Sequence, residues 1–130
     1  MGRFDNSQLR YPVVRATLAY GYGLSVTPLQ LARAYLTLAS GGKRMPLSIL
    51  KQDRQPETEQ VFDPEDVTDV LAMMELVTAQ AGTAAKANVP GYRVAGKTGT
   101  ARLVGDKGYD DERHVAWFAG MLPVLSLIHI

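Results

Sequence analysis

Length, composition and charge narrow the classes of protein to which this chain can belong. The chain has 130 residues, of which 46% are hydrophobic and 21% charged, as is ordinary for one globular domain or part of one. Its 14 basic and 13 acidic residues give a net charge of +1, which does not favour binding to nucleic acid. The chain has no cysteine, which excludes disulfides and thiolate metal sites, and no stretch approaches the ~20 apolar residues of a membrane span.

The first clear element is a helix that begins at Thr27-Pro28. A threonine hydroxyl suits the N-cap position, and proline suits the first helical position. Apolar residues recur at helical spacing from Leu29 to Ala39 with only a narrow polar stripe, so we expect this helix to be largely buried. We expect Gly41-Gly42 to end it. Before the helix, Ala19–Gly23 (A-Y-G-Y-G) is predicted to be either a loop or a ligand-facing surface.

A short strand, a loop and a second helix are predicted next. Pro46–Lys51 places Leu47 and Ile49 on one face of a strand, and polar Gln52–Gln60 is predicted to be a surface loop. Asp63-Pro64 is predicted to begin the second helix, because aspartate suits the N-cap position and proline the first helical position. Acidic residues follow in the first turn, where the helix dipole favours them. The predicted apolar face of this helix comprises Val67, Val70, Leu71, Met73, Met74, Leu76 and Val77.

An antiparallel strand pair is predicted in the last third of the chain. A small-residue turn and a short helical piece at Ala84–Ala87 lead to a strand over Arg93–Arg102. Gly105–Arg113 is polar and suits a hairpin connection. Val115–Leu122 is apolar on both faces, which predicts a strand inside a sheet covered on both sides. The order of elements favours an α+β class, with helices packed on an antiparallel sheet.

The predicted strand Arg93–Arg102 also carries the most specific chemistry in the chain. It places the cation of Lys97 beside the hydroxyls of Thr98 and Thr100, and Gly99 has no Cβ, so an anionic ligand can lie close along the strand. Taken alone, the short motif K-T-G is a weak signal that favours an ordinary strand with surface lysine and threonines, because lone motif matches are often false positives. Alternation sends Lys97 and the two threonines to opposite faces, so they serve one site only if the strand borders a groove or is locally twisted.

Several segments, in this order and spacing, resemble one family. They resemble the C-terminal part of the transpeptidase domain of class B penicillin-binding proteins, most closely the septal, division-specific type. K-T-G is a motif of penicillin-binding proteins and of serine β-lactamases. The segments that carry the resemblance are Gly21–Tyr35, Pro46–Ile49, Gly91–Ala101 and Ala116–Gly120.

The resemblance implies a domain division and a fold. Residues 1–124 are expected to form the C-terminal portion of a penicillin-binding transpeptidase domain, which is part of a serine β-lactamase/transpeptidase-like fold of helices packed on an antiparallel sheet. Residues 125–130 (L-S-L-I-H-I) depart from the family and are expected to be an atypical, non-native tail.

The resemblance also implies acyl transfer on peptidoglycan. In this family a serine attacks the D-Ala–D-Ala bond of a stem peptide, and β-lactams mimic that dipeptide. Lys97 would supply positive potential at the site, and Thr98 and Thr100 would hold the substrate carboxylate. The backbone N–H of Thr100 would donate to the oxyanion, and Gly99 would let the substrate pair with the strand edge. The implied chemistry requires no metal and no cofactor.

Two of the three motifs that the family's chemistry requires have no credible match in the sequence. S-x-N does not occur, and S-x-x-K occurs only at Ser40–Lys43 and Ser48–Lys51. Ser40 is at a predicted helix end and Ser48 on a predicted strand, so neither serine is expected to have its lysine within reach. We therefore expect the nucleophile upstream of Met1, and we expect this chain alone to be inactive and to acylate with no β-lactam.

Two other functions remain open from the sequence. One is a binding module in which Arg93–Arg102 or Tyr20–Leu24 recognises a peptide or a division partner without chemistry; the other is a relative of serine β-lactamases. The long similarity over Gly21–Tyr35 favours the transpeptidase over the β-lactamase. For the full-length family member, the resemblance implies division-protein partners and a location at the periplasmic face of the inner membrane. In the given sequence we expect no targeting signal and no membrane span.

Overall fold

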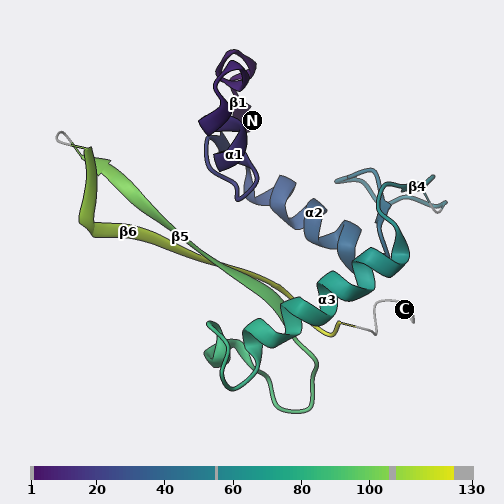
Figure 1. Ribbon diagram of the computed structural model, residues 1–130. Helices are drawn as coiled ribbons and strands as arrows, with labels where there is room; N and C mark the ends of the chain where they lie inside the picture. The colour runs from purple at the N-terminus through teal and green to yellow at the C-terminus, as the bar shows by residue number, and fades with distance from the viewer. Residues whose placement is uncertain (1, 55, 106–107, 125–130) are drawn as a thin grey trace. The chain divides into compact units, whose positions relative to one another are not determined.

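The computed structural model describes residues 2–54, 56–105 and 108–124 (Figure 1). They divide into two compact units, residues 1–34 and residues 35–130. Within the described residues the chain forms three α-helices, two 3-10 helices and three antiparallel strand pairs, which confirms the α+β class. The expectation of a non-native tail at residues 125–130 lies outside the described residues.

The first unit contains a small strand pair and two short helical segments. Strand β1 (Arg3–Phe4) pairs with β2 (Leu24–Ser25), and the 3-10 helix η1 (Asn6–Arg10) and helix α1 (Pro12–Leu18) lie between them in the chain. Asp5 caps η1, because its carboxylate accepts hydrogen bonds from the hydroxyl and the backbone N–H of Ser7. These two bonds hold the pKa of Asp5 below its usual value.

The segment Ala19–Gly23 is a turn, as one of the two sequence interpretations predicted. Gly21 and Gly23 have φ of 88° and 87°, a conformation that favours glycine. The rings of Tyr20 and Tyr22 make an edge contact with centroids 6.3 Å apart. The glycines therefore allow a tight loop that presents two exposed aromatic side chains.

Helix α2 (Pro28–Ala39) begins and ends where the sequence predicted. Thr27 Oγ1 accepts from the N–H of Gln30 at 3.2 Å, and Gln30 Oε1 accepts from the N–H of Thr27 at 2.9 Å, which makes a reciprocal capping box. The expectation that α2 is largely buried is wrong. Its only buried residue is Thr37 of the polar stripe, whereas Leu29 is 59% exposed. The apolar face of α2 is only partly covered by the described residues.

The strand predicted at Pro46–Lys51 is absent, which corrects the sequence interpretation. Ser48 Oγ accepts from the N–H of Leu50 at 3.1 Å and donates to its carbonyl at 2.8 Å, so local bonds replace a strand ladder. The nearby strand pair is instead β3 (Lys43–Arg44) with β4 (Glu59–Gln60). The described part of the predicted loop is exposed, as expected, although its last two residues form β4.

Helix α3 (Pro64–Thr78) confirms the predicted cap, because Asp63 accepts a hydrogen bond from the N–H of Glu65 at 2.8 Å. Val67 and Met74 of its apolar face are buried. Met73 and Leu76 do not widen that face as predicted, since they are 58% and 68% exposed. The 3-10 helix η2 (Ala85–Ala87) follows, at the predicted short helical piece.

A long hairpin of β5 (Ala95–Gly105) and β6 (Gly108–Met121) dominates the second unit (Figure 1). Its connection is shorter than predicted, because the strands continue to Gly105 and resume at Gly108, with a register shift between Arg102 and Val104. The expectation that β6 is covered on both faces is wrong. Trp117 and Phe118 are 62% and 44% exposed, and the described residues place only β5 beside β6.

The core of the second unit lies where α3 crosses the end of the hairpin at which β5 begins and β6 ends (Figure 1). Its buried members are Met74, Ala95, Met121 and Val124. Partly buried side chains packed against them are Tyr35, Leu38, Ala39, Val70 and Leu71. Strand β5 therefore begins in the core and continues into an exposed ribbon.

Candidate functional site

The segment Lys97–Thr100 is the accessible part of β5 that follows directly on its buried start. Lys97, Gly99 and Thr100 are exposed, and Thr98 is half-buried. Among the described strands, only β6 pairs with β5, so the other edge of β5 has no strand partner there. A strand with one edge free can accept an extended peptide by backbone pairing.

The side chain of Lys97 bends back onto the strand. Lys97 pairs with Ala119 and Thr98 with Phe118, so ordinary alternation sends Lys97 and Thr98 to opposite faces, as the sequence predicted. The Nζ of Lys97 nevertheless donates to the carbonyl oxygen of Thr98 at 2.8 Å. The ammonium group thus lies at the strand backbone, beside the carbonyl of Thr98.

The hydroxyl of Thr98 has a partner that the sequence did not reveal. Its Oγ1 lies 3.1 Å from Oγ1 of Thr83, and either oxygen can be the donor. Thr83 lies after α3 in the predicted small-residue turn Ala81–Ala84, to which no role was assigned from the sequence. The two residues are 15 positions apart, so no local pattern signals the contact.

Two glycines of β5 differ in their surroundings. A Cβ added at Gly96 would lie 2.5 Å from Cζ of Phe118, whose ring covers that glycine. A Cβ added at Gly99 would meet no described atom within 4 Å. Close packing against Phe118 therefore explains why position 96 is a glycine, whereas no described neighbour explains the glycine at position 99.

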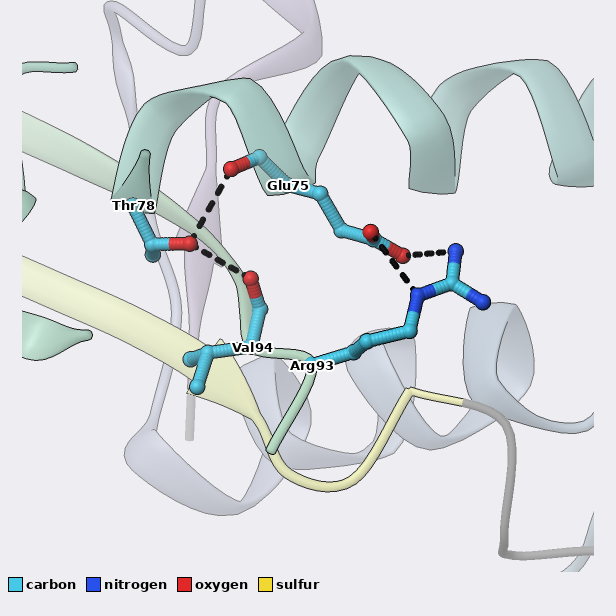
Figure 2. Close-up of polar contacts among 4 residues, drawn as sticks. All are labelled: Glu75, Thr78, Arg93 and Val94. Atoms are coloured by element: carbon cyan, nitrogen blue, oxygen red, sulfur yellow. Dashed lines mark hydrogen bonds and ion pairs between the residues drawn. The ribbon is translucent and has the colours of Figure 1, made fainter. Parts of the chain in front are cut away.

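The two residues that precede β5, Arg93 and Val94, are bonded to a single turn of α3 (Figure 2). Arg93 donates to the carboxylate of Glu75 through Nε at 3.0 Å and Nη2 at 2.6 Å. The hydroxyl of Thr78 lies 2.6 Å from the carbonyl oxygen of Val94 and 3.0 Å from that of Glu75. The sequence alone does not reveal these contacts, because the partners are 16 and 18 residues apart, beyond any helical or strand periodicity.

Neither S-x-x-K sequence has the geometry of a nucleophile with its base. Ser40 lies in the turn after α2 and Lys43 in β3. Ser48 and Lys51 lie outside helices and strands, and the Ser48 hydroxyl is occupied by Leu50 and by Gln52 Nε2 at 2.9 Å. Both serines therefore lack the helical spacing that would place a lysine beside the hydroxyl.

The described part of the chain holds neither a cluster suited to a metal ion nor a helix suited to a membrane. No cluster of three or more histidine or acidic side chains is arranged to hold a metal ion there. None of the helices in that part combines the length and the apolar character needed to cross a bilayer.

Comparison with known proteins gives concordant matches. Residues 2–126 match the family model described as penicillin binding protein transpeptidase domain. The chain is 45% identical over 122 residues to peptidoglycan D,D-transpeptidase FtsI of Escherichia coli K12, covering 94% of this chain and 21% of that protein. It is 39% identical over 111 residues to a probable peptidoglycan D,D-transpeptidase, PbpC, of Pseudomonas aeruginosa, covering 85% of this chain and 20% of that protein.

A solved structure agrees with the sequence matches. The apo transpeptidase domain of penicillin-binding protein 3 from Burkholderia pseudomallei superimposes with a TM-score of 0.83 at 43% identity, covering 94% of this chain and 38% of that one. The chain thus spans about a fifth of the length of the curated relatives and less than half of the solved domain. With a family match over nearly all of its residues, this chain belongs to the penicillin-binding protein transpeptidase domain family.

Proposed function

We propose that this chain supplies the K-T-G side of the active site of a septal peptidoglycan D,D-transpeptidase. The reaction is acyl transfer: a serine attacks the D-Ala–D-Ala bond of a stem peptide, and the acyl group then passes to an amine of a neighbouring stem. The matching relatives are named peptidoglycan D,D-transpeptidases, which supports the reaction class. β-Lactams are the expected inhibitors.

The observation that carries the proposal is the exposure of the segment Lys97–Thr100, which directly follows the buried start of β5. The ammonium of Lys97, at the strand backbone, supplies positive potential for the substrate carboxylate. Thr98 and Thr100 bind that carboxylate through their hydroxyls, and the N–H of Thr100 donates to the oxyanion. Gly99 leaves room for the substrate backbone, in accord with the open space at its Cβ position. No metal or cofactor is required for these roles.

The serine nucleophile of the proposed site comes from a part of the domain that this chain does not contain. Two observations support this. The chain spans 21% of the Escherichia coli relative, and the serines of its two S-x-x-K sequences lack a helical lysine partner. We expect the complete enzyme to act with division proteins at the periplasmic face of the inner membrane, where stem peptides are cross-linked.

A hybrid enzyme tests the proposal. In Escherichia coli FtsI, the 122 matching residues are replaced by those of this chain, and the hybrid and the free chain are each incubated with a fluorescent penicillin. Intact mass should show one adduct on the hybrid and none on the free chain. Lys97→Ala should slow acylation by about 100-fold or more, the effect typical of removing a group that stabilises developing charge.

Lys43→Ala is the matched control, because Lys43 is an exposed strand lysine that also belongs to the Ser40–Lys43 motif. Its acylation rate should equal that of the parent hybrid. An adduct on Ser40 or Ser48, or normal acylation of Lys97→Ala, would refute the proposed site. A folded hybrid that binds a D-Ala–D-Ala peptide but never acylates would instead favour the non-catalytic binding module.

A further inference from the structure

The residues just before β5 are bonded to the rest of the second unit on three sides. The side chain of Arg93 contacts Glu75, the carbonyl of Val94 contacts Thr78, and the carbonyl of Arg93 accepts from the N–H of Val124 at 3.1 Å. Two of these contacts lead to α3 and one to Val124, three residues after the end of β6. Strand β5 therefore starts from a point whose position is fixed along several directions.

The ion pair between Arg93 and Glu75 contributes more to the orientation of the chain before β5 than to the stability of the fold. It has two parallel N–H···O bonds, the fork geometry that fixes both the distance and the orientation of the partners. The side chains are 55% and 23% exposed, so solvent screens much of the attraction. Its main consequence is geometric, because it aligns the backbone of Arg93 with the last turns of α3.

Of the three contacts made by Arg93 and Val94, the one between the Thr78 hydroxyl and the Val94 carbonyl is buried. Thr78 is 5% exposed and Val94 is 8% exposed, and the oxygens are 2.6 Å apart. Glu75 and Thr78 are three residues apart, so a single turn of α3 carries both contacts (Figure 2). A buried carbonyl that lost this donor would have to move to find another partner.

We propose that Glu75, Thr78 and Arg93 are positioning residues that set the placement of Lys97–Thr100 in the active site. This inference rests on the proposed function of that segment. Lys97 is three residues beyond Val94, a distance of about 10 Å along a strand, so a small change at Val94 is carried directly to the site. Because a misplacement of ~1 Å can cost about 100-fold in rate, the contact set controls reactivity without touching substrate.

The test compares substitutions in the hybrid enzyme. Thr78→Val removes the hydroxyl and keeps the shape of the side chain, whereas Thr78→Ser keeps the hydroxyl. Arg93→Lys keeps the charge and removes the fork. Single-turnover reaction with a fluorescent penicillin separates the dissociation constant of the non-covalent complex from the acylation rate constant, at a temperature where every variant is folded.

Thr78→Val and Arg93→Lys should lower the acylation rate constant by about three- to ten-fold, the kinetic equivalent of one lost hydrogen bond. Thr78→Ser should retain nearly the parent rate. Val67→Ala is the stability control, because Val67 is 3% exposed in α3 and makes none of these contacts. It should lower the melting temperature and leave the acylation rate constant unchanged.

Either of two results would overturn the inference: parent-like acylation by Thr78→Val and Arg93→Lys, or an equal loss in Val67→Ala. The second result would mean that these residues act only through stability. Failure of the proposed function is a different observation, namely a folded parent hybrid that is not acylated or a Lys97→Ala variant that acylates normally. The two hypotheses are therefore separable in one set of proteins.

Discussion

Two consecutive segments at the start of β5 have opposite environments. Val94, Ala95 and Gly96 are buried, with exposures down to 0% for Ala95. Lys97, Gly99 and Thr100 are exposed, and Thr98 is only half-buried. The change occurs between Gly96 and Lys97, inside strand β5, with Val94 directly before the strand.

This difference in exposure distinguishes residues that pack in the core from residues with a proposed role in binding or catalysis. The buried segment contacts α3, the end of β6 and the ring of Phe118, so its residue types are dictated by the interior. The exposed segment has few neighbours in the described chain and carries a cation, two hydroxyls and an unobstructed glycine. Substitutions in the apolar packing around the first segment should therefore change stability, and substitutions in the second segment should change ligand binding and rate.

The largest effect on stability is expected from the helix residue beneath the buried segment. Met74 is 9% exposed and lies in the cluster with Ala95, Met121 and Val124. Met74→Ala should lower the free energy of unfolding of the hybrid by about 2–5 kcal/mol, since it removes a buried side chain and leaves a cavity. The adjacent Met73 is 58% exposed, so Met73→Ala should cost less than about 0.5 kcal/mol in the same urea titration. Equal losses would contradict the assignment of the buried face.

A smaller loss of stability is expected at Gly96. The added Cβ would lie 2.5 Å from the Phe118 ring and 3.0 Å from the carbonyl oxygen of Ala119. The ring must move, and Gly96→Ala should cost about 1–3 kcal/mol, as overpacking does. The double substitution Gly96→Ala/Phe118→Leu should recover part of that loss in thermal melts. A neutral Gly96→Ala would show that the ring does not cover this glycine.

The smallest effect on stability is expected at Gly99, where the proposed function predicts a change in binding instead. Gly99→Ala should leave the free energy of unfolding within about 0.5 kcal/mol, because the new Cβ meets no described atom. It should weaken the non-covalent complex with penicillin by about ten-fold, equivalent to about 1.4 kcal/mol. Parent-like penicillin binding would refute close approach of a ligand at Gly99.

Local signals in the sequence predicted the helices and the central strand because these signals act within a few residues. The caps at Thr27 and Asp63 each bond to an N–H two or three positions ahead, and the glycines after α2 end it through their backbone freedom. At Pro46–Lys51 such a local signal, the alternation of apolar residues, predicted a strand that does not form. There the Ser48 hydroxyl bonds its own backbone neighbourhood instead.

Burial could not be predicted from these local patterns. An apolar face predicts only that a surface is available for packing, and which part is covered depends on the elements that meet it. Leu29 of α2 and Trp117 of β6 are exposed although their segments are strongly apolar, whereas Thr37 of the polar stripe is buried. These three residues show that the described chain covers only part of the apolar surface it presents.

The sequence by itself determined the elements with strong local signals and the family, through caps, glycine stops and the residues around K-T-G. Only the tertiary structure decided how that motif is supported. Glu75, Thr78 and Thr83 bond to β5 or to the two residues before it from positions 15 to 18 residues earlier in the chain, and no periodic pattern links such positions. The physical reason is that hydrogen bonds across elements depend on how α3 and the hairpin pack, and packing is a property of the folded chain as a whole.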